Sequence, residues 1–248
     1  MDQQRSITVK ADGGAIVTKA NALIEAPYNL TLNEQRLILA CAAKLDGRKP
    51  MPRDAVFVLA ADEFVDLFDI DPRYAYAEME EATTRLYERD TCLPVGMVRR
   101  IEGSSRKRLR WVCMAEYKKG EGKVRLGFSP EIAPYLTMLH KRFTSYRLED
   151  VAKLRSAYAI RLFEMLVQFA DTGVFLPAGR HGLPAGRHGL PAGRHGLPAG
   201  RHGLPAGRHG LGIEEKYDRF SNLRARVIDP AVKDLVKTSL NVSWKGRS

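Results

Sequence analysis

Cysteine is scarce in this sequence, with Cys41, Cys92 and Cys113 the only three among 248 residues. Three widely separated cysteines without a Cys-x-x-Cys spacing argue against a disulfide framework and against a zinc site, and they fit a reducing compartment. No run approaches the roughly 18 apolar residues that a membrane span needs. Residues 1–19 also lack the apolar core of a signal peptide. We therefore expect a cytoplasmic protein that makes no membrane contact.

Sequence motifs for catalysis are missing as well. There is no G-x-x-x-x-G-K-[ST] segment of a P-loop ATPase, no His-x-His pair of the kind that a DNA-nicking enzyme needs, and no G-x-S-x-G. Outside a repeated segment, His140 is the only histidine. We expect no catalytic centre, no metal site and no cofactor, and thus a binding protein rather than an ATPase, nickase or polymerase.

Acidic residues are outnumbered by basic ones, 29 against 40, which leaves a formal net charge of +11. Such an excess suggests a polyanionic partner, namely DNA, RNA or an acidic membrane face, although a protein can also be basic without one. The charge is unevenly distributed. Residues 99–110 contain a single acid, Glu102, and six basic residues: Arg99, Arg100, Arg106, Lys107, Arg108 and Arg110.

A repeat accounts for five of the positive charges. Residues 176–210 consist of five tandem copies of Leu-Pro-Ala-Gly-Arg-His-Gly. The period of seven does not indicate a coiled coil, because every copy contains a proline and two glycines. Its histidines recur every seven residues, which is too wide for the usual metal-binding pair. We expect a flexible cationic insert whose ends lie roughly 30 Å apart.

The first half of the chain has the pattern of a winged helix. Thr31 and Glu34 form a Thr-x-x-Glu capping box before an apolar helical run. A strand, a short helix, a break at Asp69–Pro72 and a longer helix then outline a helix-turn-helix. Three strand-like runs and a helix capped by Ser129 follow. The expected helices are 32–45, 60–68, 73–89 and 129–139, and the expected strands are 55–59, 95–101, 108–117 and 124–128.

The second half repeats this mixture less completely. Helices are expected over 148–154, 157–170 and 216–237, with a strand over 240–244. The fold class is therefore α+β, with two winged-helix domains (helix-turn-helix plus β-hairpin), the second interrupted by the low-complexity repeat. We expect a flexible N-terminal arm over 1–20, a first domain over 21–145, and a second over 146–248 that contains the repeat at 176–210.

Two segments are candidates for DNA contact. The basic cluster at 99–110 lies on and between two wing strands, where Lys and Arg can reach phosphates or the minor groove. The alternative is a solvated charged hairpin. The candidate DNA-binding residues of this cluster are Arg99, Arg100, Arg106, Lys107 and Arg108.

The other candidate is the run from Lys216 to Pro230. Ser221 is a plausible N-cap, polar residues follow it, and Leu223, Val227 and Ile228 face inward, which is the layout of a recognition helix. Asn can read adenine and Arg can read guanine. An ordinary surface helix fits the same pattern, and Pro230 either kinks the helix or starts a new one capped by Asp229. The candidates are Arg219, Ser221, Asn222, Arg224 and Arg226.

Several separate motifs resemble the replication initiators of iteron-containing plasmids, in the family's order. The resemblance covers about residues 20–173 and 211–244. Its motifs are Asn29–Arg36, Lys141–Leu148, Tyr158–Glu164, Lys216–Leu223 and Val227–Lys233.

The resemblance implies two winged-helix domains related by pseudo-symmetry. Monomers of the family bind direct repeats, called iterons, in the double-stranded DNA of the origin, and homodimers in equilibrium with them often repress the initiator's own promoter. The initiator opens the origin and recruits the host initiator ATPase and the replicative helicase. Here the recognition helix would span Phe220 to Lys237, with Ser221, Asn222, Arg224 and Arg226 as readers. The first domain would add DNA-backbone contacts and the dimer surface.

The sequence departs from the family pattern at two places. The repeat stands where the family has strands and a short helix that support the recognition helix, and Trp244–Ser248 ends where the family continues into its second wing. The second domain is therefore expected to be incomplete. This leaves a second hypothesis open: a truncated or degenerate initiator that acts only as a DNA-binding repressor or dimerisation module.

Overall fold

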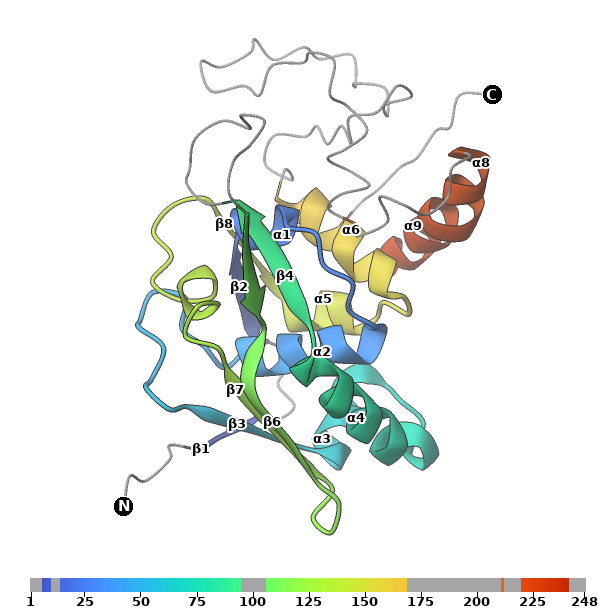
Figure 1. Ribbon diagram of the computed structural model, residues 1–248. Coiled ribbons are helices and arrows are strands. Elements are labelled where there is room, and N and C mark those ends of the chain that lie inside the picture. The colour runs from blue at the N-terminus through green and yellow to red at the C-terminus, as the bar shows by residue number, and fades with distance from the viewer. Residues whose placement is uncertain (1–5, 10–13, 95–105, 169–210, 212–219, 241–248) are drawn as a thin grey trace.

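The structure is a computed structural model that describes residues 6–9, 14–94, 106–168, 211 and 220–240 (Figure 1). The repeat at 176–210, the whole of the expected strand over 95–101 and residues 241–244 of the strand expected over 240–244 lie outside these residues. None of the helices in the described ranges has the length and apolar character that a membrane crossing requires.

A four-stranded sheet forms the base of the molecule, in the order β1-β3-β7-β6. β1 (Ser6–Val9) runs parallel to β3 (Val56–Ala60), and β7 (Lys123–Phe128) pairs antiparallel with both β3 and β6 (Val112–Lys118).

Two-stranded ribbons join β2 (Ile16–Ala20) to β8 (Phe143–Arg147), and β4 (Asp90–Pro94) to β5 (Arg106–Arg110). The prediction of a flexible arm over 1–20 is wrong for β1 and β2. Their strand partners lie far away in the sequence, so no local pattern reveals the pairing.

Among the described residues before the repeat, helices α1 to α6 lie mostly on one side of these strands, to their right in Figure 1. α3 and α4 form the predicted helix-turn-helix, which packs beside the four-stranded sheet, and α2 packs against α4. α1 and α6 lie next to the β2–β8 ribbon. The bounds are α1 (Asn21–Glu25), α2 (Leu32–Ala42), α3 (Ala61–Phe68), α4 (Pro72–Tyr87), α5 (Leu148–Ala152) and α6 (Ala157–Val167).

Local capping chemistry sets the helix boundaries. The Thr31 hydroxyl accepts from the Glu34 N–H at 3.3 Å, and the Glu34 carboxylate accepts from the Thr31 N–H at 2.7 Å, which confirms the predicted capping box. α3 ends at Asp69, whose φ of 48° is left-handed, and Asp71 caps α4 with Pro72 at its start.

Two predicted elements are wrong. The strand expected over 108–117 is split at Trp111, which is wholly buried and packs edge-on against Tyr28 with 5.0 Å between ring centroids. The helix expected over 129–139 is only the 3₁₀ turn η1 (Ala133–Tyr135). Ser129 does accept from the Ile132 N–H, but Pro134 lacks the N–H that an α-helix needs in its next turn.

A main hydrophobic core joins elements from both halves of the described fold. Leu37 of α2, Leu59 of β3, Leu126 of β7 and Phe163 of α6 belong to the same buried cluster. The domain boundary expected between residues 145 and 146 lies inside β8, and α5 and α6 share the core of the residues before it. We therefore propose that the first domain extends through α6.

Candidate nucleic-acid interface

The segment expected to read DNA is an amphipathic helix. It consists of α8 (Phe220–Leu223), the π-helical turn η3 (Arg224–Ile228) and α9 (Asp229–Leu235). Its inner face buries a stripe at every fourth residue, namely Leu223, Val227, Ala231 and Leu235. Ser221, Asn222 and Arg226 are exposed on the other side. This is the apolar back and polar front predicted for the segment.

Pro230 is accommodated by the π-helical turn. The Asp229 N–H donates to the Arg224 carbonyl, one residue further back than in an α-helix, and Pro230 has no N–H to donate. The helix therefore continues through Pro230 without a new cap. Asp229 is helical and its carboxylate lies 3.3 Å from the Arg224 guanidinium. Of the two alternatives for Pro230, a new helix capped by Asp229 is therefore wrong, and so is Ser221 as an N-cap, since Ser221 lies within α8.

The first domain holds this helix from behind. Tyr158 of α6 packs against the small cluster that contains Leu223 and Val227. Further along, Ala231 and Leu235 join the main core. In Figure 1 the α8–α9 helix stands beside α6, at the edge of the molecule. Its exposed residues thus project from a helix whose back is packed against the first domain.

Two carboxylates fix the end of α9 to the α5–α6 corner. Asp234 accepts from the Arg155 backbone N–H at 2.9 Å, and buried Asp150 accepts from the Ser239 N–H at 2.9 Å and from its hydroxyl at 2.8 Å. The Arg155 side chain continues the chain of contacts to Asp69, 2.6 Å away. The end of the α8–α9 helix is therefore tied to α3, α5 and α6 of the first domain.

The β4–β5 ribbon carries part of the basic cluster. Arg108 is exposed and ion-paired with Asp90, while Arg110 stacks on Tyr87 at 5.2 Å from the ring centroid. Arg106 and Lys107 lie on β5, opposite Pro94 and Leu93. Figure 1 shows this ribbon and the α8–α9 helix on different sides of α6, so the described residues of the two candidate groups do not form one cluster. Arg99, Arg100 and Arg219 lie outside the described residues.

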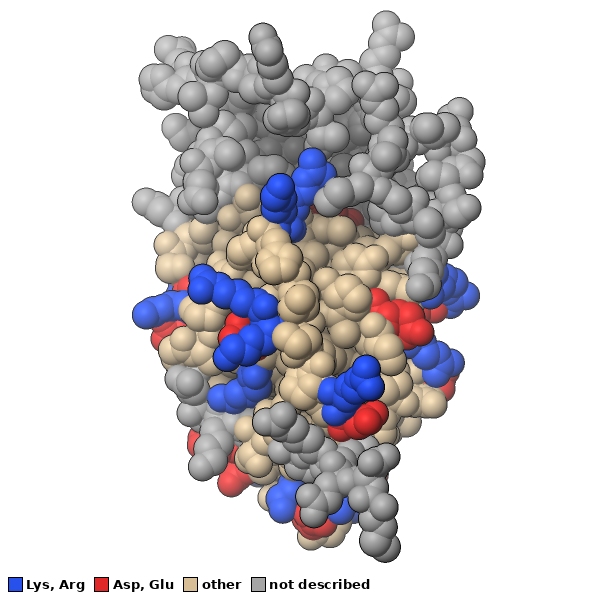
Figure 2. Space-filling view, turned by 90° about the vertical axis from the view of Figure 1, so that its left-hand side faces the viewer, with Lys and Arg blue, Asp and Glu red and all other residues tan. Residues whose placement is uncertain are grey.

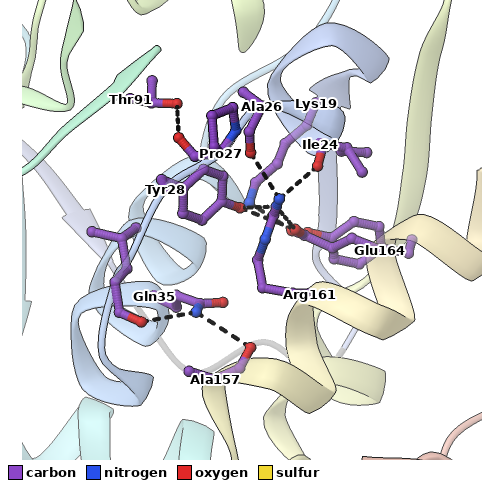
Figure 3. A network of polar contacts seen from close by, with 12 residues as sticks. Lys19, Ile24, Ala26, Pro27, Tyr28, Gln35, Thr91, Ala157, Arg161 and Glu164 are labelled. Atoms are coloured by element: carbon purple, nitrogen blue, oxygen red, sulfur yellow. Dashed lines mark hydrogen bonds and ion pairs between the residues drawn. The ribbon is translucent and has the colours of Figure 1, made fainter. Parts of the chain in front are cut away.

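A buried polar network that sequence reasoning missed lies at the centre of the fold (Figure 3). Glu164 of α6 is 0% exposed and forms a 2.6 Å ion pair with Lys19 of β2. Tyr28 and Tyr146 donate to the same carboxylate. Arg161 reaches Glu164 at 3.2 Å and donates to the carbonyls of Ile24 and Ala26.

The network alters the proton affinities of its members. Burial alone would raise the pKa of Glu164, but Lys19 and Arg161 more than offset it and hold that pKa below its usual range. Burial lowers the pKa of Lys19 in spite of the Glu164 carboxylate. Burial also raises the pKa of Tyr28 and Tyr146, which keeps both phenols protonated as donors.

The motif Asn29–Arg36 is structural too. Glu34 pairs with Arg89 at 3.1 Å, and the Gln35 amide donates to the carbonyls of Leu30 and Ala157. Arg36 is buried against the Phe68 ring, and burial lowers its pKa to about 10. The sequence signal that could have revealed this buried role is the placement of charged residues on apolar helix faces. Polar contacts from these motifs therefore connect α2, α5 and α6 in the interior, whereas the α8–α9 helix faces outward.

Comparison with protein-family models places the chain. The model for "Initiator Replication protein, WH1" matches residues 16–167. The chain belongs to this initiator replication protein family. The model for "Initiator Rep protein, WH2" matches residues 208–247. The two matches confirm the predicted fold class, which is a pair of winged-helix domains of the initiator replication protein type.

Curated relatives from Escherichia coli point the same way. A "Replication initiation protein" is 30% identical over 155 residues, which are 62% of this chain and 46% of that protein. The "PI protein" is 24% identical over 163 residues, 59% of this chain and 52% of that one. The chain thus spans about half the length of these relatives.

A solved structure shares the fold. The crystal structure of Pi initiator protein in complex with iteron DNA superposes with a TM-score of 0.67 at 19% identity. The match covers 96% of this chain and 94% of the other. At this identity the likeness shows the arrangement of helices and strands alone.

Proposed function

We propose that this protein is a plasmid DNA replication initiator that binds direct repeats, or iterons, in the double-stranded DNA of the plasmid origin. The observation that carries the proposal is the α8–η3–α9 helix, with its apolar stripe against α6 and its polar residues exposed. A helix presented in this way fits the major groove. The family membership and the iteron DNA bound by the structurally similar Pi initiator support it.

The candidate residues of the helix have separate roles in this proposal. Asn222 can pair with adenine and Arg226 with guanine in the major groove. Arg224 is held by Asp229 and would contact a phosphate, as would Ser221 and the neighbouring Arg219. The basic residues at 99–108 would contact phosphates from the wing. Phosphate contacts fix the position of the protein, and the base contacts give it sequence preference.

The remaining functions follow from this role. The initiator would act in the cytoplasm, where plasmid DNA replicates, without an ATPase, nickase or polymerase site of its own. It would recruit the host initiator ATPase and the replicative helicase, and a homodimer would exist in equilibrium with the DNA-binding monomer.

Origin opening tests the proposal. The protein is added with the host initiator ATPase to a supercoiled plasmid that carries its own origin, and unpaired thymines are mapped with permanganate. We expect reactive thymines beside the direct repeats. Binding to the repeats without any opening would instead identify a repressor.

A further inference from the structure

A second basic surface lies away from both segments considered above. It is formed by residues 44–54, which connect α2 to β3, and by residues 140–142, which precede β8. The Leu139 N–H donates to the Gly47 carbonyl at 2.8 Å, so the two segments touch. We call them the basic loop pair.

Positive charge is concentrated in the basic loop pair. Six cations stand against two acids, a net charge of +4. Within the described part of the chain, Lys49 alone of the six forms an ion pair, to Asp46 at 3.3 Å. Outside this pair, the cluster at 99–110 and the repeat, the chain carries a net charge of −3. The cations are Lys44, Arg48, Lys49, Arg53, Lys141 and Arg142, and the acids are Asp46 and Asp54.

The fold holds both segments in place. Gly47 approaches β2 so closely that a Cβ there would lie 3.1 Å from the Thr18 methyl group. The Asn21 N–H donates to the Arg142 carbonyl at 2.8 Å. All the cations of the pair except Lys44 are classed as exposed, so their side chains reach solvent from a fixed backbone. Figure 2 faces the side that carries these loops and shows basic side chains around an uncharged central area.

Like charges held close together on a fixed surface repel one another. Binding to the DNA backbone relieves this repulsion, because the phosphates neutralise the charges and the DNA releases its own counterions. We propose that the basic loop pair binds the phosphate backbone of a second DNA duplex. It lies on the left of Figure 1, whereas the α8–α9 helix lies on the far right. A duplex bound along that helix does not extend to the opposite side of the protein, so one protomer contacts two DNA segments.

Salt dependence tests the charge contact without any reference to iterons. The variant Arg48→Gln/Lys49→Gln/Lys141→Gln is compared with a control that loses the same charge from α4 and β6, Arg73→Gln/Arg85→Gln/Lys118→Gln. Binding to a random-sequence duplex is titrated at several salt concentrations. Each lost phosphate contact lowers the slope of log K against log[salt] by about 0.9. We expect a fall of about 2 to 3 for the loop variant and none for the control.

Bridging tests the second duplex. Iteron DNA is fixed to beads, and retention of a labelled duplex without iterons is measured. The wild type and the control should retain the labelled duplex; the loop variant should bind the beads normally and release it. Equal salt slopes for the two variants would overturn the proposal. The proposal would also be overturned if the loop variant lost affinity only for single-stranded DNA or for anionic phospholipid vesicles. Failure of the wild type to bind the iteron beads would instead refute the proposed function. The salt titration would still test the basic loop pair, because it uses no iterons.

Discussion

Both carboxylate oxygens of Asp150 bind Ser239, one through the backbone N–H at 2.9 Å and the other through the hydroxyl at 2.8 Å. Asp150 is 6% exposed and lies on α5 of the first domain, whereas Ser239 follows α9. The contact fixes the end of the proposed recognition helix relative to the first domain. Two winged-helix domains of one chain are therefore joined by a specific polar contact as well as by apolar packing.

Replacing Asp150 should loosen the helix without unfolding the first domain. In Asp150→Ala the Ser239 N–H and hydroxyl lose their acceptors, so we expect faster hydrogen exchange across residues 229–240. Affinity for direct repeats should fall about tenfold, equivalent to about 1.4 kcal/mol, with binding to scrambled DNA unchanged. Glu149→Ala is the matched control, since the ion pair that Glu149 forms within the described residues is with Arg147, two positions before it. Unchanged exchange in Asp150→Ala would contradict this account.

The exposed face of the helix should determine sequence preference. Asn222→Ala and Arg226→Ala each remove a proposed base contact, which is worth about 1–3 kcal/mol. Competition binding should show the loss for direct repeats and little change for scrambled DNA. Lys233→Ala removes an exposed cation near the other end of the same helix and serves as control. If all three variants lose equal affinity for both DNAs, the helix does not read sequence.

The buried network should be a large contributor to stability. Glu164→Gln removes the negative charge that pairs with buried Lys19 and Arg161, and breaking a buried ion pair in this way costs about 3–5 kcal/mol. Urea denaturation should show a much lower midpoint. Tyr146→Phe removes a single donor to the same carboxylate and should cost about 1 kcal/mol. Comparable losses of stability in Glu164→Gln and Tyr146→Phe would argue against a central role for the charge of Glu164.

The same carboxylate predicts an acid-sensitive fold. Glu164 has a pKa below its ordinary value of 4.5, so the folded state binds its proton less readily than the unfolded state. Its contribution to stability is complete above that ordinary value and is lost as the pH falls through the lowered pKa. Urea midpoints from about pH 7 down to about pH 3 should fall steeply in the wild type. Glu164→Gln should show a flatter acid limb, and parallel curves would contradict the assignment.

Elements with local causes could be predicted from the sequence. The capping box of Thr31 and Glu34 and the break at Asp69–Pro72 rely on residues within one helical turn of each other, and the structure has both. The apolar stripe of the α8–α9 helix follows from helical periodicity. Such features need no knowledge of the tertiary fold.

Elements with distant causes could not be predicted. β1 pairs with β3 about 50 residues away, and Lys19 meets Glu164 across 145 positions. At Trp111, which is buried, the chain changes its strand partner from β4 to β7, and no local pattern shows this change. Similarly, the motifs Tyr158–Glu164 and Asn29–Arg36 identified the family, but their buried polar residues, such as Gln35, Arg161 and Glu164, make contacts inside the fold.

Competition binding at several salt concentrations tests the central claim most directly. The probe is a labelled duplex with the direct repeats of the protein's own plasmid origin, and the competitor is the same duplex scrambled. The account predicts a strong preference for the repeats that persists as salt rises, because base contacts depend less on counterion release than phosphate contacts do. Equal and steeply salt-dependent binding to the two duplexes would contradict it, since only charge attraction would then remain.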